Sequence, residues 1–394
     1  MRGGRNRGLS RYPGRELAAA SFYGWAAFLV GCGGSTAEPT IPPEINNPPP
    51  EPTLAQICAA PSTDDDWPVS NLCDTGLNAE PIRAMMSSAN SHRLIGVDSV
   101  VIVHYGTVLF ETYSSSYGPT ARHDLRSATK SITSALIGIA VDRGLVPGVD
   151  APIYPYFDDL APHENWSARK DQITIENLLT MSPGLDCNDS RASSAGNESW
   201  MYRESDWVSF VLDLPVAGTP GEGFSYCTGG VVVLGELLRS ASGLRADDFA
   251  REHLFSPLGI TNYNWEFTPA GQVDTGGHIH MTARDMARIG QLFLDRGVWR
   301  GHRVVSESWV DASTLQRQDL WEDVGYGYLW WTRPMTDGNR THEVFYADGN
   351  GGQQIFVVPD LELVVTFTGS NYNSPRQEIV FELMEMFVLS VFDS

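Results

Sequence analysis

Short runs of apolar, β-branched and aromatic residues predict β-strands near both ends of the main part of the chain. Two runs rich in β-branched and aromatic residues, joined by the turn His104-Tyr105-Gly106, predict a hairpin over 99–103 and 107–113. Four further strands are predicted near the C-terminus, over 328–332, 343–347, 354–358 and 363–367.

The region between these strands has helical patterns with start and stop signals. An apolar run over 132–141 ends at Arg143-Gly144, and Thr174 and Thr282 precede two further helical patterns as N-cap residues. Other helices are predicted over 231–238 and 375–389, while 181–206 has the composition of a long irregular loop. The pattern predicts an α+β fold, with an antiparallel sheet built from both chain ends, flanked by helices, and an inserted mainly helical lobe.

Composition limits the classes of partner. The chain has 394 residues, 42% of them hydrophobic and 10% aromatic, which is enough for a large core in one or two domains. The formal net charge is −21, and the sequence pI is about 4.7. Because nucleic acids and anionic membrane surfaces bind basic patches, this charge argues against both as partners.

The N-terminal part of the chain differs from the rest. Residues 1–16 carry five arginines and one glutamate, and a short apolar stretch then leads to Leu29-Val30-Gly31-Cys32. Residues 1–31 resemble a bacterial lipoprotein signal, with Cys32 as the lipidated residue; an ordinary signal peptide or a disordered arm is the alternative. A Pro-rich linker over 32–55 would then join a membrane anchor in the cell envelope to the domain at 56–394.

Four further cysteines follow Cys32, namely Cys58, Cys73, Cys187 and Cys227. An even number in an exported chain permits two disulfides, although the sequence allows three pairings and free thiols. We expect Cys58–Cys73 to close a local loop and Cys187–Cys227 to join distant segments.

The chain contains only two lysines, Lys130 and Lys170, and each follows a serine by three residues. On the first turn of a helix, Ser127 and Lys130 would share one face, so that a neutral amine could accept the serine proton. The alternative is an N-capping serine with a solvated lysine. The second copy, Ser167 with Lys170, lies between polar segments and is interpreted as surface.

Three segments occur in a characteristic order: Ser127-Ala128-Thr129-Lys130, Tyr226-Cys227-Thr228 and Tyr346-Ala347-Asp348-Gly349-Asn350-Gly351-Gly352-Gln353. This order resembles that of the serine β-lactamase and penicillin-binding-protein superfamily. It is most similar to the class C-like branch of esterases, D-amino-acid peptidases and 6-aminohexanoate-dimer hydrolase. Further matching segments are Leu178-Leu179-Thr180-Met181, Pro257-Leu258-Gly259-Ile260, Thr282-Ala283-Arg284-Asp285-Met286-Ala287 and Gly351-Gly352-Gln353.

The resemblance covers roughly residues 80–390 and implies roles for individual residues. Ser127 would be the acylated nucleophile, Lys130 its proton acceptor and Tyr226 a proton relay; a core tyrosine is the alternative for Tyr226. The backbone N–H groups of Ser127 and Asn350 would form an oxyanion hole.

Two departures from the family pattern bear on the substrate. Thr228 stands where the second motif has asparagine, and Ala347-Asp348-Gly349 replaces Lys-Thr-Gly or His-Thr-Gly. Without a cation at position 347, and with Asp348 beside it, a substrate carboxylate would be poorly held. An ester or an uncharged amide is therefore expected at Asp348 and Gly349, although Asp348 could face the opposite side of its strand.

Other candidates are less specific. Trp200 and Tyr202 could line the substrate cleft or pack on the surface, and Trp330-Trp331 is interpreted as core and cleft wall. His278 and His280 lack an obvious third ligand, so no metal and no cofactor is expected. A D-amino-acid peptidase or β-lactamase, and a non-catalytic surface binding protein, remain alternatives to the hydrolase.

Overall fold

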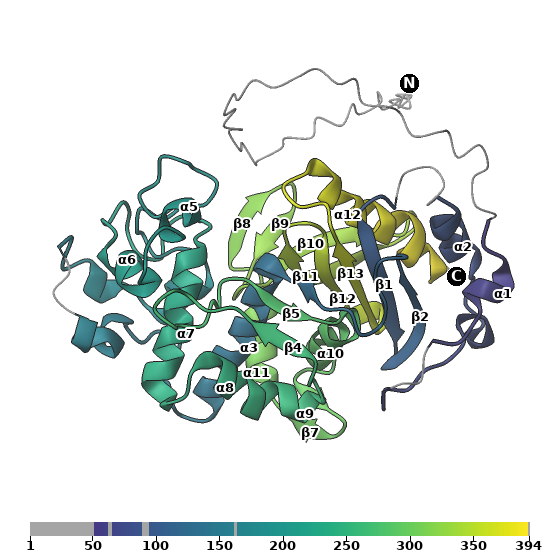
Figure 1. Ribbon diagram of the computed structural model, residues 1–394, viewed down its shortest axis with the longest axis horizontal. Coiled ribbons are helices and arrows are strands. Elements are labelled where there is room, and N and C mark those ends of the chain that lie inside the picture. Colours follow the sequence, from purple (N-terminus) through teal and green to yellow (C-terminus); the bar gives the residue numbers. More distant parts are fainter. Residues whose placement is uncertain (1–50, 62–64, 89–93, 161–163, 393–394) are drawn as a thin grey trace, which may run out of the picture. The chain divides into compact units, whose positions relative to one another are not determined.

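A central antiparallel sheet takes its strands from both ends of the domain (Figure 1). The computed structural model describes residues 51–61, 65–88, 94–160 and 164–392. The strands are β1 Val97–His104, β2 Thr107–Tyr113, β8 Gln318–Trp321, β9 Val324–Tyr326, β10 Trp331–Thr336, β11 Thr341–Gly349, β12 Gln353–Val358 and β13 Leu363–Gly369. Their order is β2-β1-β13-β12-β11-β10-β9-β8, with the N-terminal hairpin beside the last strand of the chain. The predicted fold class is confirmed.

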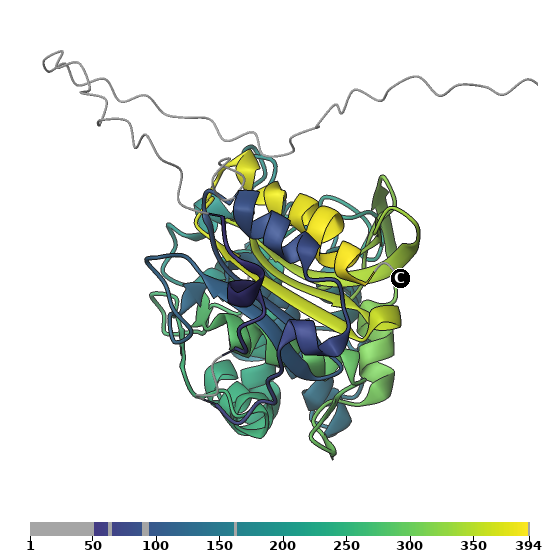
Figure 2. The ribbon, with the colours of Figure 1, turned by 90° about the vertical axis from the view of Figure 1, so that its right-hand side faces the viewer.

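Each face of the sheet is covered by its own hydrophobic core, and alternate side chains of β12 belong to one core or the other. Ile355 and Val357 belong to the core that includes helices α3 (Thr129–Asp142) and α10 (Ala283–Leu294), whereas Phe356 and Val358 belong to the core of the opposite face. Successive side chains of a strand point to opposite faces, so a strand buried on both faces is apolar throughout. Helix α2 (Glu80–Ser87) and the C-terminal helix α12 (Ile379–Leu383) cover the second face (Figure 2).

The mainly helical part of the chain is inserted between β2 and β8. Its helices are α3 Thr129–Asp142, α4 Ile175–Leu179, α5 Glu198–Met201, α6 Trp207–Asp213, α7 Thr228–Ser242, α8 Ala246–Ala250, α9 Ser256–Leu258, α10 Ala283–Leu294 and α11 Glu307–Thr314. Short strands β3 His123–Asp124, β4 Tyr263–Trp265 and β5 Ile279–Met281 form a small sheet, and β6 Val298–Trp299 pairs with β7 His302–Arg303. Thr174 and Thr282 cap α4 and α10 as predicted.

Three predicted elements differ from the structure. The strand expected over 328–332 begins only at Trp331, because the backbone of Leu329 bonds with Leu179 and Ser131 and has a φ of +61°. The expected loop over 181–206 contains the short helix α5, whose N-cap is Asn197. Within the range 375–389, where one helix was expected, only α12 is α-helical. A 3-10 helix, Pro375–Glu378, precedes it, and a π-helix, Met384–Val388, follows it.

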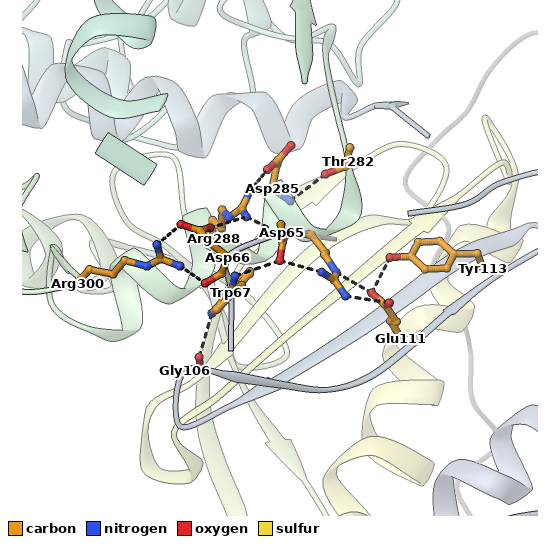
Figure 3. A network of polar contacts seen from close by, with 11 residues as sticks. Asp65, Asp66, Trp67, Gly106, Glu111, Tyr113, Thr282, Asp285, Arg288 and Arg300 are labelled. Carbon is orange, nitrogen blue, oxygen red and sulfur yellow. Dashed lines mark hydrogen bonds and ion pairs between the residues drawn. The ribbon is translucent and has the colours of Figure 1, made fainter. Parts of the chain in front are cut away.

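The segment Asp65–Trp67 is tied to the sheet and to α10 by ion pairs with two buried arginines (Figure 3). Asp65 bridges Arg284, at 3.0 Å, and Arg288, at 2.8 Å. Arg284 also pairs with Glu111 of β2 at 2.7 Å, and the indole N–H of Trp67 donates to the Gly106 carbonyl at 2.9 Å. The N-terminal part of the domain is therefore held by charge as well as by apolar packing.

Helix α1 (Leu54–Ile57) is joined to the turn at Leu72–Thr75 by the disulfide Cys58–Cys73, whose Cα atoms are 5.4 Å apart. The predicted signal over 1–31, Cys32 and most of the predicted linker lie outside the described residues. None of the helices in the described part of the chain has the length and apolar character needed to cross a bilayer.

Candidate active site

Ser127 and Lys130 meet at the start of α3. Ser127 lies in a single 3-10 turn, Arg126–Ala128, which runs directly into α3, and Lys130 is the second residue of that helix. The Lys130 Nζ atom is 2.9 Å from the Ser127 Oγ atom. Because residues three apart on a helical turn lie on one face, the local structure alone brings these two groups into contact.

Lys130 is 1% exposed, which is rare for a lysine and costly for an ammonium ion. Its Nζ also contacts the Thr228 Oγ1 atom at 3.1 Å and the Gly276 carbonyl oxygen at 2.6 Å. Burial lowers the pKa of Lys130. Four carboxylates partly offset this lowering: Asp189, Glu198, Asp274 and Asp348. The surroundings therefore favour the neutral amine, which is the form that can accept a proton.

Tyr226 is placed beside Lys130 by the segment that precedes α7. The Lys130 Nζ atom is 5.0 Å from the centre of the Tyr226 ring. The next residue, Cys227, caps α7 and forms a disulfide with Cys187, with Cα atoms 5.4 Å apart. The Asp189 N–H donates to the Tyr226 carbonyl at 2.9 Å. A covalent bond and a hydrogen bond thus hold the Tyr226 backbone to the loop over 187–189.

The end of strand β11 lies against the turn that carries Ser127. A Cβ atom added to Gly349 would lie 2.2 Å from the Leu125 carbonyl oxygen and 3.1 Å from the Ala128 nitrogen. Only glycine therefore permits this approach of the two backbones. The side-chain amide of Asn350 exchanges two hydrogen bonds with Asn373, at 2.6 and 2.8 Å. Any part of Asn350 in an oxyanion hole would come from its backbone N–H.

Asp348 and Ala347 occupy opposite faces of β11. Ala347 belongs to the core beside α3, whereas Asp348 follows the alternation of Tyr346 and accepts a hydrogen bond from Gln354 on the neighbouring strand. Burial raises the pKa of Asp348 to about 6, although Gln354 and Lys130 favour its ionised form. The predicted departure from the family motif thus leaves an acidic side chain at position 348 and a methyl group at position 347.

An aromatic cluster extends from Tyr226 to the protein surface, and the sequence interpretation identified only part of it. The Trp331 ring stacks on Tyr226 at a centroid distance of 5.9 Å and contacts Tyr326 at 4.7 Å. Phe224 and Trp321 each lie 6.2 Å from Trp331, and Trp321 is 54% exposed. We call these five residues the aromatic wall. Its members come from three separate segments, so no local pattern reveals it.

The two aromatic residues predicted to line the cleft lie on α5 and just after it, and both are exposed. Trp200 packs on the Arg203 guanidinium, 4.4 Å from its ring centre, and donates to the Ala192 carbonyl. The Tyr202 hydroxyl instead donates to Glu198 Oε2 at 3.3 Å. Tyr202 is therefore linked to the surroundings of Lys130, whereas the contacts of Trp200 stay within its own loop.

The histidines of the 276–280 segment have separate partners. His278 pairs with Asp124 at 3.0 Å and His280 with Glu266 at 2.9 Å. Within the described residues, no three His, Cys, Asp or Glu side chains are grouped as metal ligands.

The interpretation of Lys170 as a surface residue is wrong. Lys170 is fully buried, and its Nζ atom donates to the Leu212 carbonyl at 2.7 Å. Ser167 instead accepts from the Arg169 backbone N–H at 3.4 Å. The polar neighbours of Lys170 in sequence concealed an inward-pointing side chain, but the Ser-x-x-Lys spacing does not form a second Ser–Lys pair.

The fold, with a serine hydroxyl in contact with a buried amine, is that of a serine hydrolase. The chain belongs to the Beta-lactamase family, whose model matches residues 81–380. The resemblance found in the sequence is thereby confirmed.

Comparison with individual proteins places this chain among varied hydrolases. It is 27% identical over 290 residues to 6-aminohexanoate-dimer hydrolase from Paenarthrobacter ureafaciens, covering 68% of this chain and 71% of the relative. The fold is similar to EstCE1, a hydrolase with promiscuous acyltransferase activity (TM-score 0.64, 14% identity, 80% of this chain and 100% of EstCE1). It is also similar to a D-stereospecific amidohydrolase from Streptomyces sp. (TM-score 0.56, 16% identity, 73% and 93%).

Proposed function

We propose that this protein hydrolyses an ester or an uncharged amide through an acyl-enzyme on Ser127. The observation that carries the proposal is the 2.9 Å contact between the Ser127 hydroxyl and the buried Lys130 amine. Lys130 accepts the serine proton as Oγ attacks the substrate carbonyl. The proton taken up by Lys130 is relayed through Tyr226 to the leaving group, and water then releases the acyl group from Ser127.

The tetrahedral intermediate carries a negative oxygen that needs hydrogen-bond donors. The backbone N–H groups of Ser127 and Asn350 would supply them, since β11 approaches the Ser127 turn as closely as a glycine allows. Such donors are fixed before the reaction, so stabilising the oxyanion requires little rearrangement.

The substrate class follows from the charges and from the aromatic wall. Asp348 stands where the family motif has a neutral threonine, next to Ala347, so a substrate carboxylate would meet a negative group. Trp331 and Trp321 offer apolar rings next to Tyr226. These features support an uncharged substrate with an apolar or aromatic part, and the named activity of the Paenarthrobacter relative, on the dimer of an amino acid, supports cleavage of an amide.

A fluorophosphonate should form an adduct on Ser127, and the protein should hydrolyse p-nitrophenyl acetate. Nitrocefin should be turned over roughly 100-fold more slowly, because its carboxylate would meet Asp348; this factor corresponds to about 2.7 kcal/mol of lost transition-state stabilisation. Mass spectrometry of the adduct and both hydrolysis rates are the measurements, with Ser167→Ala as the control for Ser127→Ala. Full activity in Ser127→Ala, or nitrocefin turnover equal to that of the ester, would contradict the proposal.

Trp321→Ala should raise KM for p-nitrophenyl benzoate about fivefold while changing KM for p-nitrophenyl acetate much less. The reason is that an exposed indole loses part of its apolar contact area with a larger acyl group, worth about 1 kcal/mol. Trp166→Ala is the matched control, since Trp166 is 50% exposed and packs against Tyr154 at 5.2 Å. Equal changes for both esters would rule out a role for Trp321 in substrate binding.

A further inference from the structure

The hydrogen bonds around Lys130 must have a defined direction if its amine is to act as a base. A neutral primary amine carries two N–H groups and one lone pair. The Nζ atom faces three oxygen atoms: Ser127 Oγ at 2.9 Å, Thr228 Oγ1 at 3.1 Å and the Gly276 carbonyl at 2.6 Å. The lone pair can point at the Ser127 proton only if both N–H groups are directed to the other two oxygens.

Gly276 and Thr228 differ in whether they can only accept a hydrogen bond from the Lys130 amine. A carbonyl oxygen can only accept, so Gly276 fixes one N–H group. A threonine hydroxyl can donate or accept. If the Thr228 hydroxyl donated to the amine, its proton would occupy the lone pair, and the Ser127 proton would have no acceptor.

The Glu198 carboxylate lies where it can set whether the Thr228 hydroxyl donates to Lys130 or accepts from it. Its Oε2 atom lies 3.3 Å from Thr228 Oγ1, and an ionised carboxylate only accepts hydrogen bonds. With its proton directed to Glu198, the Thr228 hydroxyl presents a lone pair to Lys130. The hydroxyl of Tyr202 donates to the same Oε2 atom at 3.3 Å.

Asp189 holds Glu198 and Thr228 at this separation. One carboxylate oxygen of Asp189 accepts the Glu198 N–H at 3.0 Å, and the other accepts the Thr228 N–H at 2.6 Å. A single buried side chain thus joins the first turn of α5 to the first turn of α7. The geometry of the Lys130–Thr228–Glu198 chain is set by these backbone contacts.

We propose that Glu198 is a positioning residue that keeps the Thr228 hydroxyl as an acceptor toward Lys130, so that the amine lone pair faces Ser127. The inference rests on the proposed function of Ser127 and Lys130. The family's second motif usually has asparagine at position 228, and an amide oxygen accepts from an amine without help. Thr228 and Glu198 together therefore supply what a single asparagine oxygen supplies elsewhere.

The same arrangement predicts how the pH dependence of kcat/KM changes when Glu198 is replaced. The ionisable groups that face Lys130 are the carboxylates of Asp189, Glu198, Asp274 and Asp348 and the phenol of Tyr226. Each carboxylate favours the ammonium form, so removing the Glu198 charge lowers the pKa of Lys130 and moves the acidic limb of kcat/KM to lower pH. Burial and Glu198 raise the pKa of Asp189 to about 7. Loss of Glu198 therefore leaves Asp189 more ionised. This partly offsets the fall in the pKa of Lys130 and keeps the shift of the acidic limb small.

The test is a double-mutant cycle of Glu198→Gln and Thr228→Asn, measured as kcat, KM and pH profile on p-nitrophenyl acetate. An amide at position 198 can donate to Thr228 and reverse its hydrogen bond. Glu198→Gln should therefore lower kcat roughly ten- to hundredfold, part of the 10²–10⁴-fold that a general base contributes. In the Thr228→Asn background the same change should alter kcat less than about threefold.

The control is Glu204→Gln, which removes one exposed charge from the same loop and should leave kcat and the acidic limb in place. Thermal melting of each variant shows that it folds. An unchanged kcat in Glu198→Gln, an equal loss in both backgrounds or an unmoved acidic limb would overturn the inference. Failure of the proposed function is separate, because wild-type protein would then give no adduct on Ser127.

Discussion

Lys130→Met is expected to lower kcat/KM for ester hydrolysis by roughly 10³-fold or more, the upper part of the range for general base catalysis. Methionine has a similar length and fills the same buried space, but it offers no lone pair for the Ser127 proton. The Gly276 carbonyl loses its donor, which should cost about 1–3 kcal/mol of unfolding free energy. Steady-state kinetics and the rate of fluorophosphonate labelling measure the effect.

Lys170→Met is the matched control for this experiment. It removes the only other lysine of the chain, which is also buried and also follows a serine by three residues. Its partner, the Leu212 carbonyl, keeps a hydrogen bond from the Tyr154 hydroxyl at 2.9 Å. Activity within about twofold of the wild type is expected. Equal losses in the two variants would show that Lys130 acts through stability and not as a base.

Arg284→Met is expected to lower the free energy of unfolding by about 3–5 kcal/mol. The Arg284 side chain is 5% exposed and pairs with Glu111, which is 7% exposed, as well as with Asp65. Removing the guanidinium leaves the Glu111 carboxylate buried without its cation, and the Tyr113 hydroxyl, at 2.9 Å, compensates only in part. Denaturant unfolding followed by tryptophan fluorescence measures the loss.

Arg300→Met provides the comparison at the same segment. Arg300 is 43% exposed and pairs with Asp66, which is 72% exposed. Exposed pairs are screened by water and salt, so the change should cost less than about 1 kcal/mol. Similar losses in both variants would mean that burial gives the Arg284 ion pairs no advantage over the exposed Arg300 pair in anchoring the Asp65–Trp67 segment (Figure 3).

Contacts between residues close in the chain could be predicted from the sequence, whereas contacts between distant segments could not. The contact of Ser127 with Lys130 is local, because one helical turn fixes it, and the apolar run over 132–141 indicated that turn. The hairpin β1–β2 and the caps Thr174 and Thr282 were also predictable, since each depends on residues close in the chain. The four cysteines after Cys32 left three pairings open, and the structure joins Cys58 to Cys73 and Cys187 to Cys227.

The environment of Lys130 was not predictable in the same way. Its hydrogen-bond partners Thr228 and Gly276 lie 98 and 146 positions away along the chain, and Glu198 reaches it only through Thr228. Glu198 has no unusual sequence context, and its contact with Thr228 arises only where α5 and α7 begin side by side. Lys170 makes the same point, because its polar neighbours gave no sign that it is buried.

By itself, the sequence determined the antiparallel sheet with its helical insertion, the family, and the pairing of Ser127 with Lys130. These depend on short-range periodicity and on motifs read in order along one chain. Only the tertiary structure decided which distant oxygen atoms contact Lys130, which residues form the aromatic wall and which charges pair at Asp65 and Arg284. Those features arise from contacts between distant segments, and burial in the assembled core gives such polar contacts their strength.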